Sequence, residues 1–162
     1  YRIETNEGPG SGVKILNNPV PAAFRESVRY AEQNLYARAQ QLVGDRDPRS
    51  HEFTLQLRAF DAAKKGSKLG VAALIAMCSS MLKKPVKGGL ILVGEVNLGG
   101  SIEPISNAVN IAELAVEKGA SALLMPVTAR RQLYDLSDDM ATKVDIQFYQ
   151  DARDALLESL VE

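Results

Sequence analysis

The sequence predicts an α/β domain, and three observations support this fold class. Apolar residues recur at spacings of three and four between residues 24 and 42, which indicates one long amphipathic helix. Residues 53–57 alternate between apolar and polar side chains, as in a half-buried strand. Apolar runs of strand and helix length then alternate through the second half of the chain, which favours layered α/β packing.

The first half of the chain divides at about residue 20. Glycine and proline gather in residues 1–20, so we expect a linker or N-terminal arm there that leads into a short strand at 13–16. The domain itself is predicted to span residues 21–162. Its first helix begins after Pro21 and ends at Gly44.

The second half contains a buried helix and a hairpin. The helix is predicted from Leu69 to about Leu82, because apolar residues occupy all of its faces. Asn97–Ser101 is a glycine-rich turn after the apolar strand 90–93, so a hairpin is expected. The other predicted elements are a helix at 108–118, a strand at 122–125, a short helix at 129–136, a strand at 143–149 and a final helix at 151–160.

Composition argues against several kinds of function for this fragment. Nineteen basic and 20 acidic residues give a net charge of −1, without the basic excess typical of nucleic-acid binding. The chain has one cysteine, Cys78, and one histidine, so neither a disulfide nor a zinc site is expected. No apolar run approaches the ~20 residues that span a bilayer. A single cysteine fits a reducing, cytoplasmic setting. Because the chain starts at Tyr1 without a Met or a signal-peptide pattern, we expect a piece of a longer protein.

Two motifs have simple structural interpretations. Gly94–Ser101 is close to a phosphate-binding loop, but Gly100 stands where that loop needs lysine, so a hairpin turn is predicted and no ATP site. His51 follows Ser50 and several aspartates, which could suggest a hydrolytic triad. We predict instead a surface role for His51 at a strand end, after a salt-bridged loop at 45–50.

The segment Gly66–Gly70 could carry chemistry of its own. Its Ser67 and Lys68 stand at the entry to the buried helix, where backbone N–H groups could stabilise an oxyanion. A desolvated lysine can act as a general base for a neighbouring serine. Lysine-rich turns are also common in surface loops, so the residues alone leave both interpretations open.

From Gly66 to Pro126, the order and spacing of segments resemble the proteolytic domain of Lon proteases. In that family a Gly-Pro-Ser-Ala-Gly turn opens a helix, a Thr-Gly-Glu hairpin ends in Leu-Pro-Ile, and a later strand closes on Ile-Pro. The resemblance implies the Lon proteolytic-domain fold, with a mixed sheet and packed helices. The matching segments here are Gly66–Gly70, Lys84–Val86, Leu92–Val96, Pro104–Ile105 and Leu123–Pro126.

The resemblance also implies a Ser–Lys catalytic dyad, and both of its positions are substituted. Lys68 stands at the place of the nucleophilic serine, and Ile111, seven residues after Pro104, stands at the place of the lysine. Ser67, one residue early, is the only fallback nucleophile. Lys118 lies about 10 Å further along the predicted helix, at 1.5 Å per residue. We therefore predict no catalytic residues and no peptidase activity.

Three further stretches resemble the Lon-like proteins of bacterial BREX phage-defence systems. This resemblance implies an AAA+ ATPase module before Tyr1 that binds ATP and Mg²⁺, while this fragment holds no cofactor. It also implies a homo-oligomeric ring, a hexamer in the family, with DNA contacted by the rest of the protein. The present domain would then serve ring assembly and coupling. The three stretches are Tyr30–Leu35, Val43–His51 and Asp138–Thr142.

Two other functions stay open. The first is an active ATP-dependent Lon-type Ser/Lys endopeptidase in which Ser67 works with a displaced lysine, either Lys65 or Lys68. An amine within about 3.2 Å of the Ser67 oxygen would favour it. The second is a binding module that keeps a peptide groove along an edge strand at 53–57.

Overall fold

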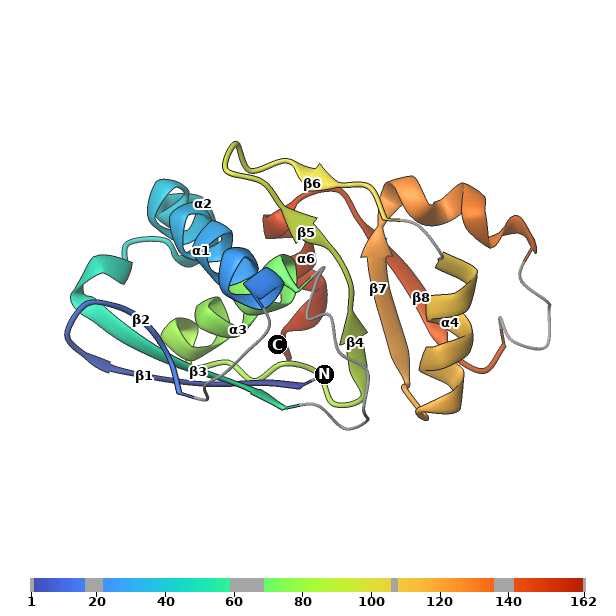
Figure 1. Cartoon of the computed structure of the whole chain (residues 1–162), viewed down its shortest axis with the longest axis horizontal. Helices are drawn as coiled ribbons and strands as arrows, with labels where there is room; N and C mark the ends of the chain where they lie inside the picture. The colour runs from blue at the N-terminus through green and yellow to red at the C-terminus, as the bar shows by residue number, and fades with distance from the viewer. Residues whose placement is uncertain (1, 17–21, 59–68, 106–107, 136–141, 162) are drawn as a thin grey trace.

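Two three-stranded sheets and the helices packed on them make up most of the described part of the chain (Figure 1). This computed structural model describes residues 2–16, 22–58, 69–105, 108–135 and 142–161. Mixed strand directions and packed helices confirm the predicted α/β class.

The first sheet has the strand order β1-β3-β2. Its strands are β1 (Arg2–Pro9), β2 (Gly12–Ile15) and β3 (His51–Arg58). β3 runs antiparallel to β1 and parallel to β2. The expected linker at 1–20 is therefore wrong for the described residues 2–15, which form both edges of this sheet. The strand predicted at 13–16 corresponds to β2.

The sequence carries no strand signal for β1 because its inward positions are largely polar. Ile3, Thr5 and Glu7 alternate along the strand, and only Ile3 is apolar. Thr5 shares a 2.5 Å hydrogen bond with Ser80 of the next layer, and Glu7 contacts His51 of β3. The polar groups thus have partners, which allows them to lie on a half-buried face.

β3 is the central strand of its sheet. Arg2 to Pro9 pair with it on one side and Gly12 to Ile15 on the other. The idea of a peptide groove along an edge strand at 53–57 is therefore wrong, because the backbone groups of 53–55 already face two neighbouring strands. Phe53 and Leu55 are fully buried, as their alternation predicted.

The first predicted helix is present but broken. α1 (Ala22–Ala37) and α2 (Ala39–Val43) are separated at Arg38, whose φ of −123° leaves the helical range. The predicted apolar stripe is buried and faces the next helix. Phe24, Val28, Ala31, Leu35 and Leu42 are buried, while Ala39, the remaining predicted member, is partly buried against the same core.

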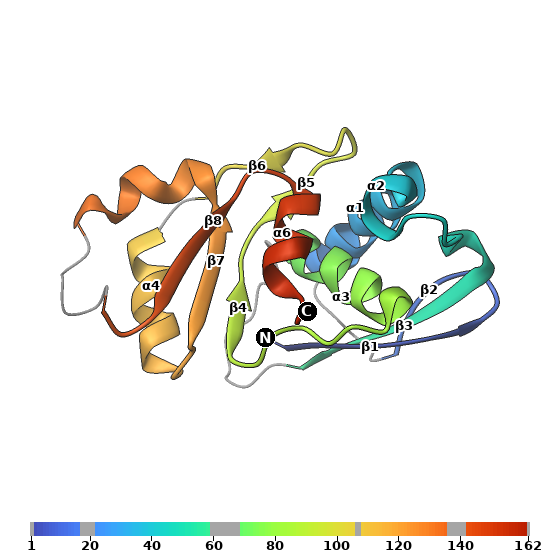
Figure 2. The same cartoon turned by 180° about the vertical axis from the view of Figure 1, so that it is seen from behind.

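The buried helix is α3 (Gly70–Leu82), as predicted. It packs against α1, against β1 and against α6 (Ala152–Ser159), the final predicted helix. Figure 2 shows α3 and α6 from behind, with α4 on the far side of the second sheet. Among the described residues, no helix combines the length and apolar character needed to cross a membrane.

The second sheet has the order β4-β7-β8, with all strands parallel. β4 (Leu90–Leu92), β7 (Ala122–Pro126) and β8 (Asp145–Tyr149) match three predicted strands. α4 (Ala108–Glu117) covers its outer face (Figure 1). The short helix expected at 129–136 is instead the 3₁₀ segment η2 (Val127–Asp135).

This second sheet separates two cores. Leu124 of β7 points into the first core, which α1, α3, β3 and α6 share. Leu123 and Met125, on the other face of β7, belong to the second core with α4 and η2. Alternation along one buried strand therefore supplies both cores.

The predicted hairpin joins β5 (Glu95–Val96) to β6 (Ile102–Glu103). Its turn is closed by Asn97, whose carbonyl accepts from Gly100 N at 3.0 Å and whose side-chain oxygen accepts from Ser101 N at 3.1 Å. The near match to a phosphate-binding loop is thus a hairpin turn, as expected.

Candidate functional site

Of the two dyad positions, the structure describes Ile111 but not Lys68. Ser67 and Lys68 lie outside the described residues, so the distance between Ser67 and any lysine stays a matter of prediction. Ile111 lies on α4 and packs, partly buried, against the second core. Lys118 lies just after the end of α4 and is exposed. The position expected for the lysine of the dyad thus holds a packing residue.

The amino-terminal end of α3 meets the hairpin at Gly70. Val71 N donates to the carbonyl of Gly94 at 3.3 Å, which connects the helix to the segment between β4 and β5. A Cβ atom on Gly70 would lie 1.8 Å from Glu95 Oε1 and 2.9 Å from its Cδ. Only a glycine therefore lets the Glu95 carboxylate lie against the first turn of α3.

Donors from α1 and from the backbone of β5 help to hold Glu95 there. The hydroxyl of Ser27, which is 1% exposed, donates to Oε2 at 2.5 Å, and Val96 N donates to Oε1 at 3.0 Å. A carboxylate near the positive end of a helix is favourable. Glu95 is also the glutamate of the hairpin that resembles the Thr-Gly-Glu hairpin of Lon proteases, so this corner is the part of the expected site that the structure describes.

A buried tyrosine supports the same corner. Tyr149 donates its hydroxyl to the carbonyl of Val93 at 2.7 Å. Burial raises the pKa of Tyr149, and the negative charge of Glu95 adds to the rise. The phenol is therefore neutral at every physiological pH and acts as a fixed donor rather than as a base.

Helix α1 holds the turn of the hairpin. Asn34, 1% exposed, donates to Asn97 O at 2.9 Å and to Tyr30 O at 2.8 Å. Its side-chain oxygen accepts from Arg38 at 3.0 Å, and Arg38 in turn donates to the carbonyl of Gly99. The break of the helix at Arg38 thus lies beside a contact that fixes the hairpin.

Replacing Asn34 with alanine is expected to lower the free energy of unfolding by about 2 kcal/mol. The change removes three hydrogen bonds of a buried side chain and leaves the Arg38 guanidinium with one partner fewer. Urea denaturation of the purified chain measures the effect. Gln33→Ala, at an exposed position of the same helix, is the control and should change stability by less than about 0.5 kcal/mol. Equal losses in both variants would show that the Asn34 contacts are unimportant.

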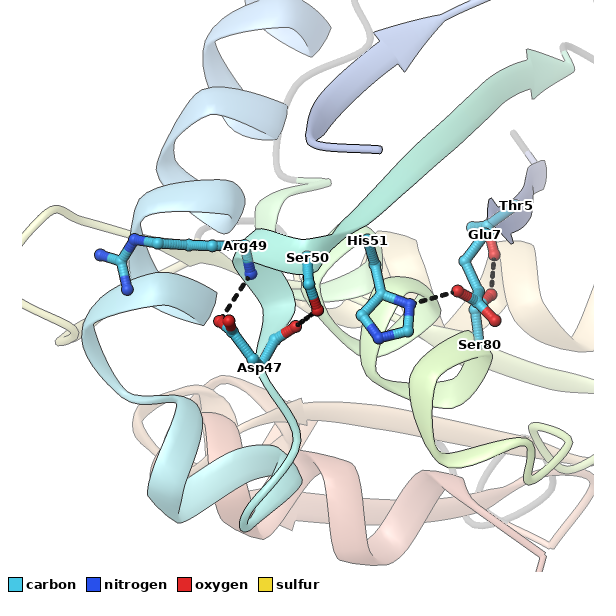
Figure 3. A network of polar contacts seen from close by, with 7 residues as sticks. All are labelled: Thr5, Glu7, Asp47, Arg49, Ser50, His51 and Ser80. Carbon is cyan, nitrogen blue, oxygen red and sulfur yellow. Dashed lines mark hydrogen bonds and ion pairs between the residues drawn. The ribbon is translucent and has the colours of Figure 1, made fainter. Parts of the chain in front are cut away.

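The region around His51 is structural (Figure 3). His51 Nδ1 lies 2.5 Å from Glu7 Oε2, while Ser50 donates to the backbone carbonyl of Asp47 at 2.8 Å. Ser50 and His51 thus bond to different partners, and together with an aspartate they do not form a triad. Asp47 caps the short turn Pro48–Ser50 by accepting from Arg49 N at 3.0 Å. His51 lies at a strand end, as predicted.

The loop at 45–50 differs from the salt-bridged loop that was expected. The Arg49 guanidinium lies 4.9 Å from the centre of the Tyr36 ring and packs over its face. Asp47 uses its carboxylate for the backbone cap instead. Since a cap is a local contact, it competes well with a flexible surface ion pair.

Metal and thiol chemistry find little support in the described residues. Across the described ranges, no three histidine, cysteine, aspartate or glutamate side chains gather where they could hold a metal ion. Burial raises the pKa of Cys78 to about 12. The thiol thus stays protonated and packs as a small apolar group.

Ser27 and Asn34 were missed in the sequence, although a signal exists. They lie seven residues apart on α1 and share its buried face with the apolar stripe. A polar residue at such a position needs a partner. Both partners lie in the hairpin at 95–97, more than sixty positions away. The pattern indicates that partners exist but does not say where.

Family comparison identifies the class of protein. The family described as the Lon protease (S16) C-terminal proteolytic domain matches residues 1–162. The chain therefore belongs to this family, and the predicted Lon proteolytic fold is confirmed.

Individual relatives show which members of the family the chain resembles. The chain is 28% identical over 165 residues to the Lon-like protease BrxL of Escherichia coli O9:H4, covering 99% of this chain and 23% of the relative. It is 25% identical to the Lon-like protease BrxL of Bacillus cereus, over 99% of this chain and 24% of that protein. A Lon protease of Methylocella silvestris is 27% identical over 95% of this chain and 19% of the relative. The chain spans about a quarter or less of the length of these relatives.

Proposed function

We propose that this chain is the Lon-like C-terminal domain of an AAA+ ATPase of the BREX phage-defence type, and that it has no peptidase activity. In this proposal it holds together the subunits of a cytoplasmic homo-oligomeric ring, expected to be a hexamer, and transmits ATPase motion. ATP and Mg²⁺ bind to an upstream module, and DNA is contacted by the rest of the protein. Likeness over 99% of the chain to two Lon-like proteases BrxL supports the assignment.

One observation carries the proposed loss of activity. Ile111, at the position expected for the catalytic lysine, is an apolar side chain that packs against the second core. A serine hydroxyl without a positioned base is a weak nucleophile, and general base assistance typically contributes 10²–10⁴-fold. The scaffold around the site does not depend on that base, because Gly70, Glu95 and Ser27 fix the helix and hairpin through their own contacts.

The second candidate is an active Ser–Lys endopeptidase that uses Ser67 with a displaced lysine. The names of the relatives, which are called proteases, favour this candidate. It requires a lysine amine near Ser67 that comes from a position other than 111. The two candidates therefore predict different effects of replacing Ser67 on peptide cleavage.

Replacing Ser67 with alanine in the full-length protein is expected to leave phage restriction unchanged. The purified parent and the variant should both fail to cleave casein above the level of a blank. Ser101→Ala, in the exposed hairpin turn, is the matched control for removing a hydroxyl. Cleavage by the parent that Ser67→Ala abolishes and Ser101→Ala preserves would overturn the proposal in favour of the endopeptidase.

A further inference from the structure

The turn after α3 carries three exposed lysines. Lys83, Lys84 and Lys87 form no ion pair among the residues that the structure describes. Lys83 ends α3 in the left-handed conformation, with a φ of 55° and a ψ of 36°. Every other residue with positive φ in the described chain is a glycine, the residue that this conformation favours. The chain thus has a lysine where glycine would suit the backbone better. We call residues 83–87 the basic turn.

The backbone of the basic turn is held in place from both sides. The Ser79 hydroxyl donates to Lys84 O at 2.5 Å, and Val161 N donates to Pro85 O at 2.9 Å. Val86 and Val161 are 39% and 43% exposed. The turn therefore presents cations and apolar side chains together on a fixed backbone, so that little order would be lost on binding.

The outer side of α4 has the opposite charge. Asn110, Glu113, Leu114 and Glu117 follow the spacing of one helical face, and all four are exposed. The two glutamates stand four residues apart, where like charges destabilise a helix, and Glu117 lies at the negative end of the helix dipole. Neither glutamate forms an ion pair within the described ranges, whereas Lys118, next in the chain, already has an interaction. We call the four exposed residues the α4 face.

The two surfaces lie on opposite sides of the second sheet. α4 packs on one side through Ala108, Ala112 and Ala115 of the second core. The basic turn belongs to the other side, because Val86 pairs with Leu160 of the first core. Figure 2 shows α4 on one side of this sheet and the segment from α3 to β4 on the other. One copy of the chain therefore has room for a different neighbour at each surface.

We propose that the basic turn of one copy of this chain binds the α4 face of the next copy. Each surface has an exposed apolar side chain between charges, Val86 between lysines and Leu114 between glutamates, and the two sets of charges are opposite. Because the two surfaces differ, the contact is head-to-tail, and such contacts form a ring when the rotation between neighbours closes. The inference rests on the proposed ring assembly and names the surfaces that form it.

The surroundings of the lysines favour a second copy over a nucleic acid as the partner. A phosphate backbone is bound mainly through its charge and gains nothing from the exposed Val86 and Val161. Interfaces between proteins, in contrast, combine an apolar centre with a polar rim. The same chain also supplies the complementary surface, in which Glu113 and Glu117 are exposed and form no ion pair within the described ranges.

Zero-length cross-linking of the full-length protein tests the contact. A carbodiimide joins a carboxylate to a lysine amine where the two touch, and mixing protein labelled with light and heavy nitrogen identifies bonds between subunits. We expect peptides that join Glu113 or Glu117 of one subunit to Lys84 or Lys87 of another. Mass photometry of the same sample measures assembly. A ring without these cross-links would overturn the interface and leave ring assembly standing, whereas a protein that stays monomeric would overturn both.

Charge reversal tests the complementarity of the two surfaces. Glu113→Lys with Glu117→Lys makes both surfaces of a copy basic, and Lys84→Glu with Lys87→Glu makes both acidic. Each variant alone should need a roughly tenfold higher concentration to assemble, because like charges then meet. An equal mixture should assemble like the unmodified protein, since the two variants can alternate around the ring. A mixture that assembles no better than either variant alone would overturn the proposal.

Two controls separate the contact from loss of structure. Arg29→Glu with Arg46→Glu reverses two exposed cations on α1 and after α2, and should leave assembly unchanged. The thermal melting curves of both charge-reversed variants should match that of the unmodified protein, since the replaced side chains are exposed. Equal loss of assembly in the control would show that total charge, rather than these two surfaces, governs association.

Discussion

Replacing Gly94 with alanine is expected to lower the free energy of unfolding by about 4 kcal/mol. Gly94 has a φ of +153°, which alanine rarely adopts, and a Cβ there would lie 1.8 Å from the Tyr149 hydroxyl and 3.4 Å from Val71. Backbone strain and overpacking each cost about 1–3 kcal/mol. Urea denaturation followed by circular dichroism measures the sum.

Two comparisons separate the strain from the steric clash. Gly119 has a φ of +74°, and a Cβ added there would have no neighbouring atom within 4 Å, so Gly119→Ala should cost only about 1 kcal/mol from strain. In a Tyr149→Phe background, Gly94→Ala should cost about 2 kcal/mol, because the hydroxyl in the way is gone. An unchanged cost in that background would show that the hydroxyl is not the obstacle.

Replacing Gly70 with valine is expected to destabilise the chain by about 3 kcal/mol. The new side chain would occupy the space of the Glu95 carboxylate and separate it from Ser27, so overpacking adds to a lost buried hydrogen bond. Calorimetric melting and urea denaturation would both report the loss. Gly88→Val is the matched control, because no atom lies within 4 Å of a Cβ at Gly88.

The Gly70 effect should be coupled to Glu95. Glu95→Ala alone leaves the Ser27 hydroxyl without its acceptor, which costs about 1–3 kcal/mol. In that background, however, Gly70→Val meets an open space, so the double variant should be more stable than the sum of the two single changes implies. Strict additivity would contradict the proposed close approach of the carboxylate to α3.

Local patterns in the sequence predict most of the fold. The apolar stripe of α1, the alternation in β3 and the all-apolar α3 each match their observed element, because burial repeats with the period of the backbone. β1 was not predicted, because its inward-facing Thr5 and Glu7 are polar and form hydrogen bonds with Ser80 and His51. Hydrogen bonds between residues that lie 75 and 44 positions apart leave no periodic pattern in the sequence of either segment.

The candidate site, like the fold, could be predicted from the sequence only in part. The spacing of the motifs in the sequence predicts that both dyad positions are substituted. The structure adds that Ile111 packs against the second core. The closeness of Ser27, Gly70 and Glu95 depends instead on how α1, α3 and the hairpin meet. Three-dimensional packing brings together residues that are each ordinary in their own segment.

The place of β3 between β1 and β2 has a practical consequence for expressing this domain. A fragment that began at residue 21 would leave both hydrogen-bonding edges of β3 open. Unpaired strand edges recruit other chains and promote aggregation. Expression of this domain should therefore retain residues 2–15 in full, and a fusion partner or affinity tag belongs before them rather than in their place.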